Sequence, residues 1–225
     1  MKYLRFILLF NLLLSFSANA LLEVNILKSK EAAFPIVIAP FEVIGDSKDN
    51  VDIAKIIRDN LNRSGQFSAL STDSLVTNQI DFNFWKEHKK DAVVFGKVEQ
   101  ISPKVYNIYI YIYDVFSEKS LYQKKITVSN TGFRKMAHFL SDKIYYVLLG
   151  QKGSFNTRLS YVTVTDNNSG GRTYRLQISD SDGENPQTIV RQSNPILSPA
   201  WSKDQQKLAY VSFKNNRSEV FVMTP

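Results

Sequence analysis

The feature that most constrains this chain is a change of hydrophobic period near Gly153. From about Phe34 to Gly150, apolar residues at helical spacing alternate with short strand-like runs. Beyond Gly153 the helical spacing stops, and short apolar segments are separated by Gly, Asn, Asp, Ser and Pro. The sequence therefore predicts two architectures in succession, the first of interleaved helices and strands and the second of strands alone.

The first half predicts an α/β domain with a mixed sheet in two or three layers. Helices are expected at 53–61, 84–88 and 133–148, and strands at 34–39, 67–70, 92–98, 106–113 and 121–128. Asp49 or Asn50 is the expected N-cap of the first helix. In the strand 106–113 the isoleucines face one way and the tyrosines the other. We interpret the tyrosine face as packing under a helix, with a partner-binding patch as the alternative.

The second half contains a repeat. Arg158–Val162 reappears as Lys207–Val211, and Tyr174–Ile178 is echoed by Ser218–Val222, at offsets of 49 and 44 residues. Strand-rich repeats of that length are typical of β-propeller blades. A blade takes roughly 40–45 residues and a ring needs at least about four blades. Residues 154–225 are therefore expected to form incomplete propeller repeats, about one blade plus unpaired strands, of a shortened or interrupted protein.

The first twenty residues have the pattern of a secretory signal. Lys2 and Arg5 precede an apolar run, and the small residues Ala18 and Ala20 occupy the two positions that a signal peptidase reads. The run is short for a retained membrane anchor, which is the alternative. The chain has no cysteine, so lipoprotein processing is not expected. We predict cleavage after Ala20 and a mature chain that begins at Leu21.

Charge and composition argue against most catalytic and nucleic-acid functions. The formal net charge is +7, but the basic doublets are isolated rather than gathered in a stripe, so nucleic-acid binding is not expected. The two histidines, His88 and His138, have no cysteine, histidine or carboxylate at ligand spacing. We predict no catalytic residue, no metal and no cofactor. The run Asp180–Gly183 lacks the later ligands of a calcium loop and predicts a hairpin turn.

Several motifs, in order along the chain, resemble one family. Ser198–Ser202 followed by Lys207–Val211 resembles the blade signature of TolB-type propellers, in which an SPAWSPDG turn leads into a KLAYV strand. Lys203 and Gln205 stand where that family usually has proline and glycine, which leaves the geometry of this turn open. Further segments similar to the family are Pro35–Phe41, Leu61–Phe67, Gly153–Val162 and Ser179–Gly183.

The resemblance implies a fold and a domain plan. The expected fold is an α/β domain with a layout similar to anticodon-binding domains, followed by the first blades of a β-propeller. The plan places the signal peptide at 1–20, a partner-binding segment at 21–33, the α/β domain at 34–153 and incomplete propeller repeats at 154–225. The implied location is the periplasm.

The resemblance also implies a function without catalysis. Members of the TolB family link TolA to the lipoprotein Pal in the Tol–Pal envelope system and support outer-membrane constriction at cell division; colicins or porins are further implied partners. The segment that engages TolA corresponds here to Leu21, Leu22, Glu23, Val24, Asn25 and Ile26. An ordinary first strand is the alternative for this segment. The alternative functions are a propeller accessory to a secreted hydrolase or peptidase, and a nucleic-acid module.

Overall fold

The computed structural model describes residues 33–45, 52–73, 76, 79–166 and 170–225. In the first half the strands are β1 (Phe34–Ile38), β2 (Glu42–Ile44), β3 (Phe67–Leu70), β4 (Ala92–Ser102), β5 (Val105–Asp114) and β6 (Ser120–Ser129). The helices are α2 (Ile53–Arg63), α3 (Phe82–Glu87) and α4 (Phe133–Leu149), the last preceded by a 3-10 turn at Asn130–Gly132. The predicted interleaving of helices and strands is confirmed.

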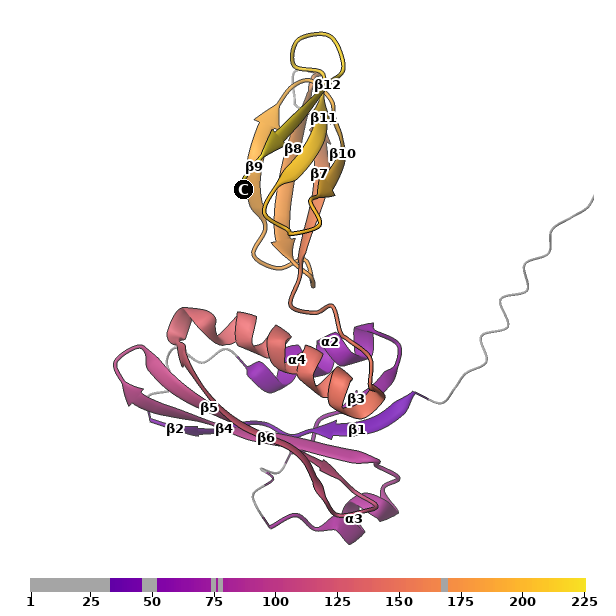
Figure 1. Cartoon of the computed structure of the whole chain (residues 1–225), viewed down its shortest axis with the longest axis vertical. Coiled ribbons are helices and arrows are strands. Elements are labelled where there is room, and N and C mark those ends of the chain that lie inside the picture. Colours follow the sequence, from indigo (N-terminus) through magenta and orange to yellow (C-terminus); the bar gives the residue numbers. More distant parts are fainter. Residues whose placement is uncertain (1–32, 46–51, 74–75, 77–78, 167–169) are drawn as a thin grey trace, which may run out of the picture. The chain divides into compact units, whose positions relative to one another are not determined.

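These strands form one mixed sheet in the order β3-β1-β4-β5-β6, with β2 paired to the far part of β4 (Figure 1). The pairs β1–β3 and β1–β4 are parallel, whereas β4–β5 and β5–β6 are antiparallel hairpin pairs. Ile36, Val37 and Ile38 of β1 are buried, as the short continuous apolar run predicts for an inner parallel strand.

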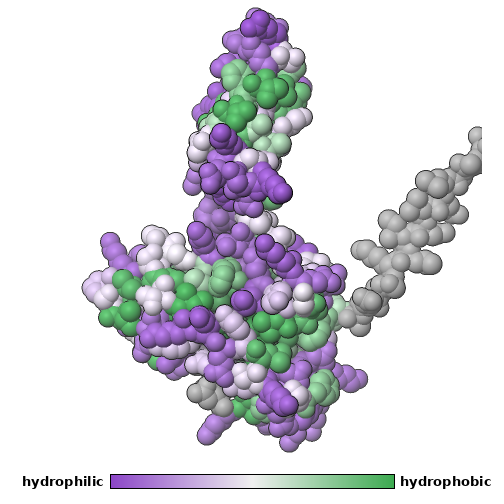
Figure 2. Space-filling model, in the orientation of Figure 1, coloured by the Kyte–Doolittle hydropathy of each residue, from purple (hydrophilic) through white to green (hydrophobic). Residues whose placement is uncertain are grey.

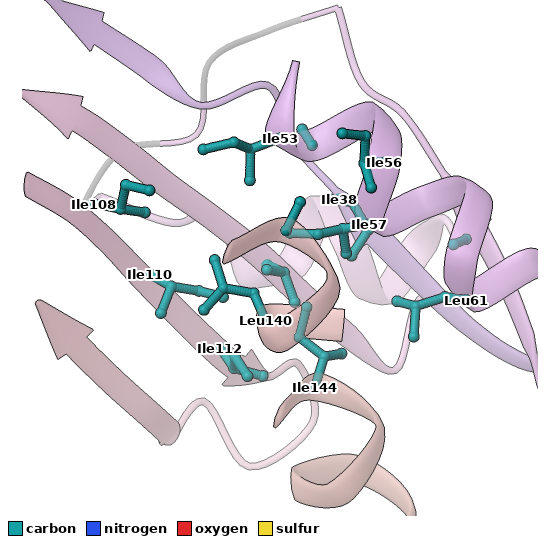
Figure 3. Packing of buried hydrophobic residues seen from close by; sticks show 14 of the residues in the cluster. Ile38, Ile53, Ile56, Ile57, Leu61, Ile108, Ile110, Ile112, Leu140 and Ile144 are labelled. Atoms are coloured by element: carbon teal, nitrogen blue, oxygen red, sulfur yellow. The ribbon is translucent and has the colours of Figure 1, made fainter. Parts of the chain in front are cut away.

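Helices α2 and α4 cover one face of the sheet. The predicted α2 stripe of Ile53, Ile56, Ile57 and Leu61 is buried, and Figure 3 shows it facing the isoleucines of β5 together with Leu140 and Ile144 of α4. The expected N-cap was wrong. Helix α2 is capped by Asp52, whose carboxylate accepts a hydrogen bond from the Lys55 backbone N–H at 2.9 Å, because Asp52 directly precedes the first helical residue.

Helix α3 packs against the opposite face, so the domain has three layers over part of the sheet (Figure 1). Trp85 of α3 belongs to the same buried cluster as Phe95, and Tyr111 and Tyr113 stack on the Phe95 ring at centroid distances of 5.0 and 6.0 Å. Packing therefore accounts for these two tyrosines. Tyr109 is half-buried, with its hydroxyl donating to Glu99 at 2.9 Å.

The second half consists of two three-stranded antiparallel sheets. The first contains β7 (Arg158–Asp166), β8 (Arg172–Asp180) and β9 (Gln187–Gln192), and the second contains β10 (Ile196–Trp201), β11 (Leu208–Ser212) and β12 (Glu219–Met223). They share a core of Leu176, Ile178, Ile196 and Leu208. The sequence repeat is confirmed, because β7 and β8 are paired in the same way as β11 and β12.

Neither sheet in the described part is a complete four-stranded blade, contrary to the expectation of about one complete blade. The counterpart of β10 in the first repeat would fall 49 residues earlier, where α4 ends and the linker begins. In the described residues this stretch is the end of α4 and the start of the linker, so it adds no strand to the first sheet. Val220 and Val222 of β12 expose 71% and 63% of their surface, and Figure 2 shows apolar residues on the surface of this half.

The turn between β10 and β11 has a left-handed residue although it lacks glycine there. Gln205 has φ +58°, and its backbone N–H donates to the Ser202 carbonyl at 2.8 Å. The Ser202 hydroxyl accepts from the Lys207 N–H at 2.9 Å. These bonds stabilise a backbone conformation that glutamine alone disfavours.

Gly96 of β4 provides a test of the packing. A Cβ at this position would overlap the Phe41 ring and the Tyr109 carbonyl oxygen. We expect Gly96→Ala to lower the free energy of unfolding by about 1–3 kcal/mol, measured by urea denaturation, because the buried sheet cannot move aside. Gly132→Ala is the control, since its Cβ would meet its nearest neighbours at 3.6 Å. Equal stability losses in the two variants would contradict the packing.

Candidate functional site

The predicted partner-binding residues and the predicted cleavage site lie outside the described residues. Leu21, Leu22, Glu23, Val24, Asn25 and Ile26, and likewise Ala18 and Ala20, precede residue 33. Their assignment stays a prediction.

A cluster of charged and buried polar side chains lies where α4 meets the turn between β8 and β9. Arg134 of α4 donates from Nε to Asp180 Oδ2 at 3.0 Å and from Nη2 to Asp182 Oδ2. Asp180 also accepts from Asn185 Nδ2 at 2.8 Å, within the turn. The side chains of Arg134 and Asp182 are only 23% and 13% exposed, so this pair is shielded from water more than a surface ion pair.

His138, one helical turn beyond Arg134, faces the same two carboxylates. Its Nε2 lies 3.6 Å from Asp182 Oδ2 and 3.9 Å from Asp180 Oδ2, too far for a hydrogen bond. The side chain is 3% exposed, and this nitrogen has no hydrogen-bond partner. A buried donor without a partner is costly, which makes this position unusual among the described residues.

The other ring nitrogen of His138 joins a buried network with α2. Asn60 Nδ2 lies 2.9 Å from His138 Nδ1 and also donates to Ser141 Oγ at 2.9 Å. Arg63 donates to Asn60 Oδ1 at 2.8 Å, which fixes the oxygen of the amide on the other side. Since the amide N–H points at Nδ1, that nitrogen accepts, and we assign the single proton of neutral His138 to Nε2.

The surroundings shift the pKa values of His138 and Asp182. Burial lowers the pKa of His138, the charges of Asp182 and Asp180 oppose that shift, and Arg134 and Arg63 add to it. Burial would raise the pKa of Asp182, but hydrogen bonds from Arg134 and the Glu184 N–H and the Arg134 charge hold it below its ordinary value. Near neutral pH the contact therefore joins a neutral imidazole, a cation and carboxylates.

His138, Asp180 and Asp182 have the donor types of a transition-metal site, with ligand atoms within 4.8 Å of one another. Two contacts disfavour that use. Arg134 already bonds the carboxylates, and Asn60 leaves the proton on Nε2, the atom that a metal would need. We interpret the trio as part of an ion-paired contact.

Helix α4 also holds the segment that leads into β7. The Asp142 carboxylate accepts from the backbone N–H groups of Phe155 and Asn156 at 2.7 and 3.1 Å. A side chain on Gly153 would overlap Asp142, so only glycine allows this close approach. Beside this segment is a cavity of about 340 Å³ whose lining includes Arg63, Tyr145 and Phe155.

Sequence reasoning missed this cluster. The search for carboxylates at ligand spacing along the chain did not find the two that face His138, because Asp180 and Asp182 lie about forty residues away in the sequence and only folding brings them close. One signal was present: Arg134 and His138 lie four residues apart and so share a helix face. His88 lies elsewhere, with Nδ1 2.7 Å from the Phe84 carbonyl oxygen of its own helix.

Comparison with known proteins gives consistent matches along the chain. The model of the TolB amino-terminal domain matches residues 22–121, and that of the TolB beta propeller domain matches residues 145–224. The Tol-Pal system protein TolB of Ruthia magnifica subsp. Calyptogena magnifica is 57% identical over 208 residues, and that of Vesicomyosocius okutanii subsp. Calyptogena okutanii (strain HA) is 52% identical over 206. Each alignment covers 92% of this chain and 49% of the relative.

The chain belongs to the TolB family. The crystal structure of TolB from Acinetobacter baumannii matches with a TM-score of 0.75 at 33% identity, covering 85% of this chain and 47% of that one. The chain thus spans about half the length of the TolB relatives it matches. The predicted fold, an α/β domain followed by propeller sheets, is confirmed.

The cluster of Arg134, His138, Asp180 and Asp182, here called the α4 cluster, connects regions on both sides of the gap between the two TolB matches. Arg134 and His138 fall between the matched ranges, whereas Asp180 and Asp182 lie within the propeller match. The cluster therefore joins the α/β domain to the first propeller sheet. None of the helices in the described ranges is both long and apolar enough to cross a membrane.

A double-mutant cycle tests the strength of the Arg134–Asp182 pair. For Arg134→Met and Asp182→Asn we expect a coupling energy of about 1–3 kcal/mol in urea unfolding, because the pair is mostly shielded from water. The matched control is the exposed pair Lys55–Asp59, with side chains 64% and 55% exposed. Its cycle with Lys55→Met and Asp59→Asn should give a far smaller coupling, because water screens the exposed pair. A coupling energy no larger than that of the control would contradict the shielding of the Arg134–Asp182 pair from water.

Proposed function

We propose that this chain is a periplasmic, non-catalytic binding component of the Tol–Pal envelope system. The observation that carries the proposal is the ordered match to both TolB domains on one chain, with relatives named Tol-Pal system protein TolB. The signal-like first twenty residues support export of the mature chain.

The proposed partners are TolA and Pal, which the chain links in support of outer-membrane constriction at division and of envelope integrity. TolA is assigned to the segment Leu21–Ile26, because a terminal peptide with strand-like alternation is suited to adding a strand to a partner's sheet. Pal is assigned to the propeller, of which the described residues include two three-stranded sheets. Colicins or porins are further proposed partners.

The alternative of a propeller that accompanies a secreted hydrolase or peptidase is not favoured. Relatives aligned over 92% of the chain carry the Tol-Pal name. The α4 cluster likewise resembles a structural ion-pair network more than a reactive centre, because Arg134 bonds both of its carboxylates.

Affinity capture tests the partner assignment. The mature chain 21–225, and a variant that starts at Leu27, are each presented to TolA and to Pal. We expect the shortened chain to lose at least about tenfold in TolA affinity, because the strand-forming residues are gone. Circular dichroism checks that the α/β domain is still folded.

The control replaces Lys28, Lys30 and Glu31 with serine and leaves Leu21–Ile26 intact. This control should bind TolA as the mature chain does. Unchanged TolA capture by the shortened chain would refute the segment assignment. If the intact mature chain captured neither TolA nor Pal, the proposed function itself would be wrong.

A further inference from the structure

His138 is a buried titratable group that is not used in the proposed partner binding. Its two ring nitrogens are both suited to the neutral form. Nδ1 receives the N–H of Asn60 at 2.9 Å, and Nε2 carries the proton yet lies beyond hydrogen-bond distance of the carboxylates.

A second proton on His138 would fit poorly. It would add an N–H at Nδ1, directly opposite the Asn60 N–H, so two donors would face each other. The Asn60 side-chain amide is hindered from flipping, because its oxygen accepts a hydrogen bond from Arg63 and its nitrogen donates one to the Ser141 hydroxyl. The ring is also 3% exposed, so water does not solvate the new charge.

We propose that His138 is a proton-operated release for the contact between α4 and the β8–β9 turn. Uptake of a proton at mildly acidic pH favours an arrangement in which the turn separates from α4 and the imidazole reaches water. The inference rests on the described contact and does not depend on the Tol–Pal assignment.

The charged groups that face His138 come from three elements. Arg134 lies on α4 and Arg63 on α2, and both oppose a positive ring. Asp180, the last residue of β8, and Asp182, in the β8–β9 turn, favour a positive ring, but both are already bonded to Arg134. Desolvation is the largest influence on His138 and lowers its pKa, so the balance in the closed contact is against the proton.

The direction of the pH effect follows from linkage. In an open arrangement water reaches the imidazole and relieves the burial that lowers the pKa of His138 in the closed contact, so the pKa lies closer to its ordinary value of about 6.5. As pH falls below about 6.5 the open form binds more protons and gains population. At one pH unit below that value the ratio of open to closed forms rises by up to about tenfold. The lowered pKa of Asp182 keeps that carboxylate ionised in the same range.

A cavity lies beside the contact between α4 and the β8–β9 turn. It measures about 330 Å³ and is lined on the helix side by Lys55, Asp59 and Arg134 and on the turn side by Asp182 and Glu184. Water therefore already reaches the polar edge of the contact, and separation of the turn extends that water to the ring.

The experiment is an NMR titration and hydrogen-exchange series of the mature chain from pH 7.5 to 5.0. With two histidines in the chain, their ring signals are readily assigned. We expect His138 to titrate below pH 6.5 and the amide signals of residues 181–184 to move with it. Exchange of these amides, corrected for its intrinsic pH dependence, should speed up by as much as about tenfold at pH 5.5.

Two glutamine variants complete the test. His138→Gln removes the titrating group and should make exchange in residues 181–184 independent of pH over this range. His88→Gln, at the histidine outside the cluster, should behave as the unmodified chain. The unmodified titration stands by itself if His138→Gln does not fold.

Three results would overturn the proposal. The first is that the signals and exchange rates of the turn amides stay unchanged while His138 titrates. The second is that acid slows their exchange. The third is that His88→Gln, rather than His138→Gln, abolishes their response. Slower exchange in acid would mean that the carboxylates bind the charged ring and tighten the contact.

Discussion

The pairing of Arg134 with Asp180 and Asp182 is the interaction on which the joining of the two halves depends. The helix that carries it makes three other kinds of contact. Helix α4 buries Leu140 and Ile144 against the sheet, meets α2 through the Asn60–Ser141 hydrogen bond, and holds the linker with Asp142. One rigid element thus anchors both the core of the α/β domain and the start of the propeller sheets.

An ion pair of this kind contributes more to geometry than to stability. Bringing the three charges out of water costs much of what their attraction gains. The guanidinium bonds each carboxylate through a different nitrogen, which fixes the turn in one register against the helix. The adjacent His138 is buried beside these ion pairs but is not hydrogen-bonded to either carboxylate. The contact is therefore sensitive to the protonation of this one side chain.

Local patterns predicted most of the fold, because helical stripes, strand alternation and turn residues are encoded over a few neighbouring positions. The α2 stripe from Ile53 to Leu61 and the β7–β11 repeat are examples. The cluster around His138 was not predictable in that way, since its members come from α2, α4 and a turn far along the chain. The missing first strand of the first sheet also depends on context, because α4 occupies that stretch of sequence.

The central claim, that Arg134 fixes the α/β domain to the first propeller sheet, is tested most directly by a distance measurement between spin labels. The chain has no cysteine, so Lys135→Cys on α4 and Arg191→Cys on β9 give two unique, exposed labelling sites. Pulsed electron–electron double resonance at pH 7.5 should give one narrow distribution of distances between the two labels. This distribution should broaden when Arg134→Met is added. Equally narrow distributions with and without Arg134 would contradict the account.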